Sequence, residues 1–96
     1  MIVGILQFEI AVHGSGSLKD KRRVVKSLKD RLHREHQVSV AEVGKQDQHV
    51  HAVLGLALVS TDVPHIQSVL DRLIDKLQHH RDFELVDHRK EILTGK

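Results

Sequence analysis

Apolar side chains alternate with other residues along the first segment of the chain. Between residues 2 and 13 the even positions carry Ile, Gly, Leu, Phe, Ile and Val, while the odd positions are mixed. A period of two predicts a strand with its even face, including Phe8, in the core. Residues 49–60 are apolar at both even and odd positions over their middle. That pattern predicts a second long strand, either central in a sheet or covered by a partner.

Two other segments have helical spacing instead. Ser17 and Asp20 are placed as a capping box, and apolar residues follow at positions 24, 25, 28 and 32, which predicts a helix ending near residues 35–37. Pro64 opens a second helix, whose apolar stripe occupies positions 66, 69, 70, 73, 74 and 77. Shorter strands are predicted at 38–43 and from 83 to about 92.

The predicted elements follow the order strand–helix–strand, and this order occurs twice along the chain. Two such units most often form an α+β ferredoxin-like βαββαβ sandwich, with a four-stranded antiparallel sheet and both helices on one face. We expect residues 1–96 to form a single domain of this kind, because the length suits one small core.

The amino-acid composition excludes several kinds of chemistry and of cellular location. With no cysteine, the chain has neither disulfides nor thiolate chemistry, and this agrees with a reducing compartment. Its apolar runs are too short to span a bilayer, and the first residues do not form a signal-peptide pattern. We therefore expect a cytoplasmic protein that does not associate with membranes.

Positive charge gathers on the first predicted helix. Residues 19–36 hold eight Lys or Arg against three acids, a net of +5, whereas the whole chain has a net charge of only +2. Such a focus of charge predicts a polyanion-binding surface, although a merely solvated helix face is the alternative. The candidate residues are Lys19, Lys21, Arg22, Arg23, Lys26 and Lys29.

The turn before this helix offers a weaker candidate. Gly14, Gly16 and Ser17 precede the helix, and free backbone N–H groups there could hold a phosphate. The glycines do not match a P-loop, and capping alone accounts for Ser17. The sequence also lacks the Gly-x-x-Gly loop of KH domains and the strand aromatics of RNA-recognition motifs.

The nine histidines raise the question of a metal site. His49 and His51 share a strand face, and His79 and His80 are adjacent, but neither pair has the further ligands that a closed zinc site needs. Solvated histidines are the simpler interpretation, so we expect neither a metal nor a cofactor. For catalysis, no base, nucleophile and orienting group come together around Glu42, and we expect a non-enzyme. Glu42 alternates with Val40, which suggests partial burial and an ion pair with a cation of the first helix.

Two motifs carry a family resemblance. They are SLKDKRRVVKSL at residues 17–28 and VSVAEVGKQD at residues 38–47. With them the whole chain resembles the YlxP-like family of bacterial proteins, catalogued as domain of unknown function 503. The resemblance implies a ferredoxin-like fold and marks Glu42, Gln46 and Asp47 as motif residues. Relatives commonly continue with a Leu-Trp step, where this chain has Gln48 and His49.

The family resemblance also bears on function. No enzymatic activity is established for the family, and its genes tend to lie among those for translation initiation and ribosome maturation. This implies a binding protein that associates with RNA or the ribosome through the basic helix. The alternative is a dimeric protein-interaction or regulatory module that binds an acidic protein or a small anion.

We also expect a homodimer through the outer sheet face. Val3, Ile5 and Ala11 lie opposite Phe8 and leave apolar surface on that face. Polar residues could instead keep the face wet; these are Gln7, Glu9, His49 and His51.

Overall fold

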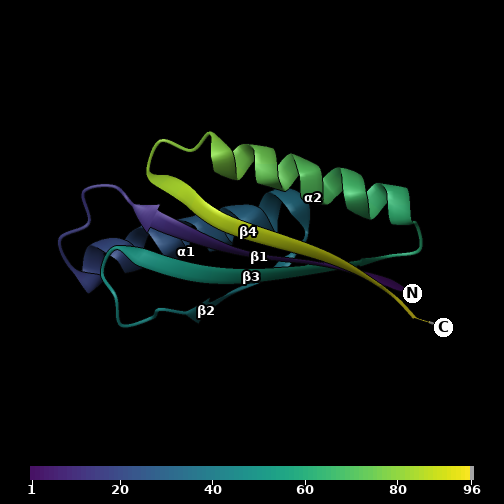
Figure 1. Cartoon of the computed structure of the whole chain (residues 1–96), viewed down its shortest axis with the longest axis horizontal. Helices are drawn as coiled ribbons and strands as arrows, with labels where there is room; N and C mark the ends of the chain where they lie inside the picture. The colour runs from purple at the N-terminus through teal and green to yellow at the C-terminus, as the bar shows by residue number, and fades with distance from the viewer. Residues whose placement is uncertain (96) are drawn as a thin grey trace.

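The computed structural model describes residues 1–95, which form four strands and two helices (Figure 1). In chain order they are β1 (Ile2–Val12), α1 (Leu18–His36), β2 (Ser39–Gly44), β3 (His51–Ser60), α2 (Val63–Gln78) and β4 (Phe83–Thr94). The strands form one sheet in the order β2-β3-β1-β4, and all neighbouring strands are antiparallel. This is the α+β ferredoxin-like arrangement that the sequence predicts.

Both helices cover the same face of the sheet. The even residues 4–12 of β1 and 52–58 of β3 are buried beneath them, and Phe8 is only 1% exposed, as expected from its place in the alternation. Gly4 shows how closely α2 approaches β1. A Cβ atom at Gly4 would lie 2.5 Å from Cγ2 of Ile66, so only glycine allows this contact. The hydrophobic core therefore lies between one sheet face and the two helices.

Local signals fix the ends of α1. Ser17 is the N-cap, and its Oγ accepts a hydrogen bond from the backbone N–H of Asp20 at 3.2 Å. The C-cap is Gln37, which follows the last helical residue, adopts a left-handed conformation (φ 54°) and donates its backbone N–H to the His33 carbonyl. Both ends agree with the predicted start and stop, because capping depends on neighbouring residues alone.

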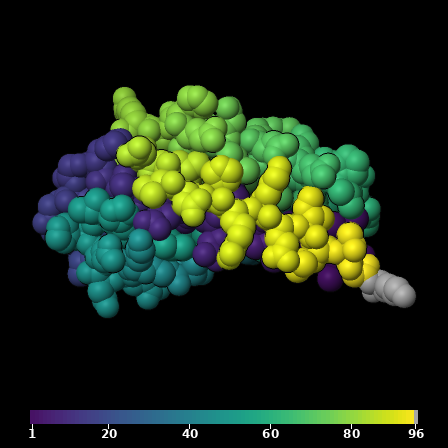
Figure 2. Space-filling model, viewed as in Figure 1, coloured from purple at the N-terminus to yellow at the C-terminus, as the bar shows by residue number. Residues whose placement is uncertain are grey.

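The opposite face of the sheet has no helix over it. In Figure 2, β1 (purple) is visible between the teal of β2 and β3 and the yellow of β4. The residues of β3 predict a strand that is either central or covered by a partner, and β3 is central, between β2 and β1. On its outer face Val59 is 64% exposed. Among the described residues, the helices thus cover the sheet on one side only.

Element boundaries differ slightly from the prediction. Strand β3 begins at His51 rather than at residue 49, because His49 and Val50 belong to the loop that packs beside the start of α1; there, the Ser15 hydroxyl donates to the His49 carbonyl. At its other end, β4 continues past residue 92 to Thr94, pairing with Ile2. In the part of the chain that the structure describes, neither helix has the length and apolarity needed to cross a membrane.

Candidate polyanion-binding surface

Helix α1 carries a row of solvent-exposed cations. Lys19, Arg22, Arg23 and Lys26 are exposed, and Lys29 is half-buried. Within residues 1–95, these five side chains make one ion pair, between Lys26 and Asp30 at 3.9 Å, and both partners are exposed to solvent. Such a pair contributes little. Most of the positive charge on this side of α1 is therefore not neutralised by neighbouring acids.

Arg34 extends the same surface beyond the predicted set. It is exposed and lines a shallow hollow together with Arg23 and Lys26. Its position, eight residues after Lys26 on the helix, places it on the same side at two turns' distance. Helical periodicity was the signal that could have included it.

Lys21 does not belong to this surface, and its assignment to the polyanion-binding set is wrong. Its side chain is fully buried, with an exposed fraction of 0%. The residue lies four, seven and eleven positions before Val25, Leu28 and Leu32, which form the buried stripe of α1. Helical spacing therefore directs Lys21 inward, despite its charge.

The buried ammonium of Lys21 is enclosed by oxygen atoms. It donates to the carbonyls of Lys45 at 2.9 Å, His51 at 3.1 Å and Gln46 at 3.3 Å. Its Nζ also lies 3.0 Å from Oε2 of Glu42, whose side chain is 15% exposed. The predicted pairing of Glu42 with a cation of the first helix is thus confirmed, and the cation is Lys21.

This cluster holds both ends of the β2–β3 connection. The carbonyls of Lys45 and Gln46 follow β2, whereas that of His51 begins β3. Gln46 adds a bond from its side-chain Nε2 to the Glu42 carbonyl at 3.1 Å. Among the motif residues, Glu42 and Gln46 therefore hold the loop against α1, and Asp47 is exposed near its tip.

The turn before α1 uses its polar groups internally. The N–H of Gly16 donates to Asp20 Oδ2 at 3.1 Å, and the Ser17 hydroxyl accepts from Asp20 N. The Asp20 carboxylate already provides the negative charge at this helix N-terminus. Gly14 has a φ of 67°, which serves the turn. The structure thus gives Gly14, Gly16 and Ser17 a capping and turning role.

The histidine pairs remain without further ligands. Within residues 1–95, no three His, Cys, Asp or Glu side chains gather closely enough to hold a metal ion. His51 instead shares Oε2 of Glu9 with Lys45, each at 2.9 Å. The hydrogen bond from Lys45 lowers the pKa of the Glu9 carboxyl.

Two other histidines lie where α1 faces α2. Burial lowers the pKa of His36, and the nearby Lys76 ammonium, 3.1 Å from its Nε2, lowers it further. Burial likewise lowers the pKa of His80, whose Nδ1 accepts the backbone N–H of Asp82 at 3.1 Å. Folding therefore favours the neutral form of both rings.

These lowered pKa values predict a loss of stability in acid. Below about pH 6.5 the unfolded chain takes up protons on His36 and His80 before the folded chain does, so the free energy of unfolding falls as pH falls towards the folded pKa values. We expect the melting temperature to drop over this interval. The double variant His36→Gln/His80→Gln should show a smaller drop than His65→Gln, which changes an exposed histidine of α2. Equal drops in the two variants would contradict the assignment.

The sequence of this chain is similar to those of known proteins over nearly its whole length. A family model described as "Protein of unknown function (DUF503)" matches residues 3–90. The chain belongs to this family. It is also similar to the uncharacterized protein YlxP of Bacillus subtilis (strain 168), with 29% identity over 90 residues that cover 94% of this chain and 98% of the relative. The residues 3–90 that the family model matches span α1, β2 and the β2–β3 loop.

Proposed function

We propose that this protein is a cytoplasmic binding protein that attaches to RNA, free or within the ribosome, through the exposed cations of α1. The observation that carries the proposal is the row of exposed, largely unpaired cations on one side of the helix. Positions 19, 22, 26 and 29 are three or four residues apart, so at about 1.5 Å per residue they recur about every 4.5–6 Å along the helix. A row of this kind suits contact with successive phosphates.

Contacts with phosphate supply affinity without sequence choice. The helix therefore accounts for attachment to RNA, and its charge gives the association a strong dependence on salt. A small anion needs few cations, whereas this row extends over several turns, so a polyanion fits it better than the small anion of the alternative proposal. An acidic protein remains the competing partner, and the test separates the two.

The test is a titration of the protein with two fluorescently labelled ligands, a short single-stranded RNA and a polyglutamate peptide of equal charge. We expect the RNA to bind more tightly, and log K to fall with log salt concentration by about 0.7 per phosphate contact between roughly 50 and 200 mM salt. RNA that fails to bind at the lowest salt, or that binds no better than polyglutamate, would overturn the proposal.

We further propose a homodimer through the outer face of the sheet. Five apolar residues form a patch there, which we call the outer apolar patch: Val3, Ile5, Ala57, Val59 and Leu93. They are neighbours across three strands, since Val3 pairs with both Val59 and Leu93, and Ile5 pairs with Ala57. Val59 and Leu93 are 64% and 45% exposed. Two-fold pairing of such patches is the commonest way to cover them.

A cluster of polar residues lies towards the other end of this face. Glu9 with Lys45 and His51 forms a hydrogen-bonded cluster near the β2–β3 loop. Gln7 lies between this cluster and Ile5 along β1. The Glu9 cluster therefore does not interrupt the outer apolar patch, whose nearest polar neighbours are Glu91, opposite Ile5 on β4, and Ser39, opposite Ala57 on β2.

A single charge in the patch tests the dimer. Ile5→Lys should give a monomer by light scattering at ~100 μM, where the unaltered protein should be dimeric if its Kd is ~1 μM or lower. Lysine is chosen because Glu91 faces Ile5 across the strands and can pair with it, which preserves the fold. Val86→Lys, at an exposed apolar residue outside the patch, is the matched control and should remain dimeric. An unaltered protein that is monomeric at this concentration would rule the dimer out.

A further inference from the structure

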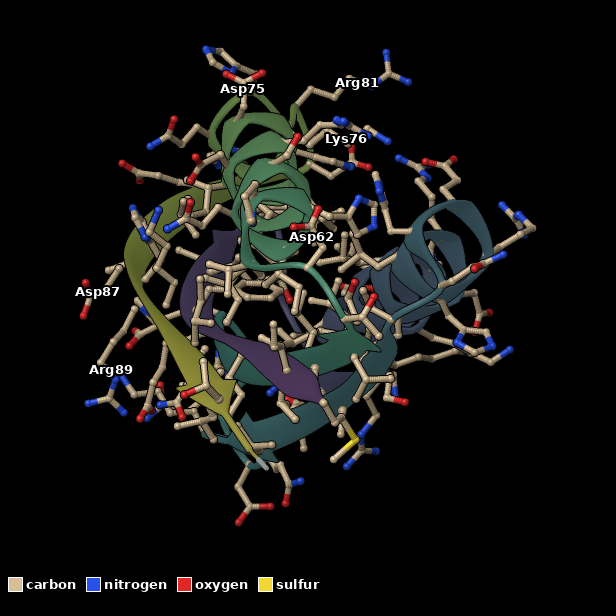
Figure 3. The ribbon with its side chains drawn as sticks, turned by 90° about the vertical axis from the view of Figure 1, so that its right-hand side faces the viewer. Asp62, Asp75, Lys76, Arg81, Asp87 and Arg89 are labelled. Carbon is tan, nitrogen blue, oxygen red and sulfur yellow. The ribbon has the colours of Figure 1, made fainter. Side chains whose placement is uncertain are left out.

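A groove runs along α1 on the helical side of the molecule, and its other wall is the end of α2 together with the connection from α2 into β4. It consists of two adjoining hollows of about 260 and 220 Å³, which share Leu28, Arg31 and His80 in their walls. Arg31 Nη1 and His80 Nε2 lie 3.3 Å apart where the two hollows meet. Figure 3 shows Lys76 directed from α2 towards α1. Helix α1, the end of α2 and the start of β4 thus enclose space that a small ligand could fill.

The floor of the groove is apolar and includes a stacking platform. Leu28, Leu32 and Leu77 line one hollow, and Val24 and Phe83 line the other. The ring of His80 stacks on that of Phe83, with centroids 4.3 Å apart and planes inclined by 15°. Because Phe83 is buried and fixes the imidazole, His80 offers a rigid planar surface at the groove.

The rim of the groove is cationic. Arg23, Arg31 and Lys76 line it, with Glu35 and Asp82 as the acids. The negative charge of Glu35 is already balanced by Lys76, which donates a hydrogen bond to its carboxylate at 2.7 Å. This hydrogen bond also lowers the pKa of the Glu35 carboxyl. Within residues 1–95, neither Arg23 nor Arg31 makes an ion pair with an acid within 4.0 Å. Two guanidinium groups therefore stand beside an apolar slot.

We propose that this groove takes one unpaired nucleotide of a bound RNA, with the base on the apolar floor beside His80 and the adjacent phosphate at Arg23 and Arg31. The inference rests on the proposed function, since Arg23 belongs to both the polyanion-binding surface and the groove. A strand that lies along α1 reaches the groove at this residue. Stacking on histidine and arginine planes is a common way in which proteins hold unpaired RNA bases.

The dimensions favour a base over other apolar ligands. Each hollow is smaller than the 300–1,000 Å³ of typical drug-sized sites. A planar ring fits such a hollow, whereas a peptide helix needs a longer continuous surface. The combination of an apolar hollow with guanidinium groups also matches the two halves of a nucleotide, its base and its phosphate.

The first experiment separates the base from the phosphates. The full chain is titrated with a short single-stranded RNA and with an abasic oligonucleotide of the same length, which keeps the phosphates but lacks the bases. The proposed function needs only that RNA binds in a salt-dependent manner. The groove inference also needs the abasic oligonucleotide to bind at least about fivefold more weakly, because base stacking contributes that much or more. Equal affinities would overturn the groove inference and leave the proposed function standing. If neither ligand binds, both proposals fail.

The second experiment fills the groove without removing a charge. Ser27 lines the hollow that contains Phe83, so Ser27→Phe should block it. We expect this variant to bind RNA and the abasic oligonucleotide with the same affinity, losing the fivefold difference. The matched control is Ser68→Phe on an exposed part of α2, which should keep the difference. Circular dichroism serves as the control that both variants are folded. A Ser27→Phe protein that still distinguishes the two ligands as the unaltered protein does would contradict the inference.

Discussion

Replacing Lys21 with methionine should lower the free energy of unfolding by about 3–5 kcal/mol, the usual result of removing one partner from a buried ion pair. Methionine fills nearly the same volume but supplies neither charge nor hydrogen bonds. The change leaves the Glu42 carboxylate, 15% exposed, without its cation. It also leaves the carbonyls of Lys45, Gln46 and His51 without their shared donor.

Urea unfolding measures this loss, and Lys19→Met provides the control. Lys19 is exposed on the same helix, so its replacement should change stability by no more than about 0.5 kcal/mol. Amide hydrogen exchange should also show that the β2–β3 loop becomes less protected in the Lys21 variant. That loop-specific change distinguishes loss of the cluster from a general weakening of the core.

A second substitution isolates the ion pair within this effect. Lys21→Met/Glu42→Leu removes both charges, so the double variant should be more stable than the two single losses together predict. The carbonyl groups still lack a donor, and full recovery is therefore not expected. Strictly additive losses would show that Lys21 and Glu42 are not coupled.

Lys21 also shows where sequence reasoning reaches its limit in this protein. Residue type alone groups Lys21 with its exposed neighbours Arg22 and Arg23. Its burial depends on oxygen atoms that lie 21 to 30 residues later in the chain and that only the tertiary fold brings together. The stripe of Val25, Leu28 and Leu32 carried the relevant signal, since Lys21 continues it by one turn.

The fold itself could be predicted because its signals are local. Alternation in β1, the Ser17 cap and the Pro64 start each depend on a few neighbouring residues, and the order of elements then leaves few topologies. The groove could not be predicted, because the distance of α1 from the end of α2 and the start of β4 is a tertiary property. The outer apolar patch could be predicted only in part: Val3 and Ile5 follow from alternation, but their neighbour Leu93 follows from the register with β4.

Removing four cations from α1 should weaken RNA binding and flatten its dependence on salt. In the variant that changes Lys19, Arg22, Lys26 and Lys29 to glutamine, log K should fall less steeply with log salt. The slope should become shallower by up to ~3 units, at about 0.7 for each phosphate of a single strand that the protein no longer binds. None of the four residues contributes to the hydrophobic core, so the fold should persist. A far-ultraviolet circular dichroism spectrum and a thermal melt check this.

The decisive comparison is with a variant of equal net charge. Changing Arg72, Arg81, Arg89 and Lys90 to glutamine also removes four cations, from α2, the loop after it and β4. All four are exposed, and the one ion pair among them within residues 1–95, Lys90 with Asp71, is open to solvent and contributes little. If α1 is the binding surface, this control should keep most of the affinity and the salt slope. If both variants bind RNA equally weakly, binding follows the net charge of the protein and the assignment to α1 is wrong.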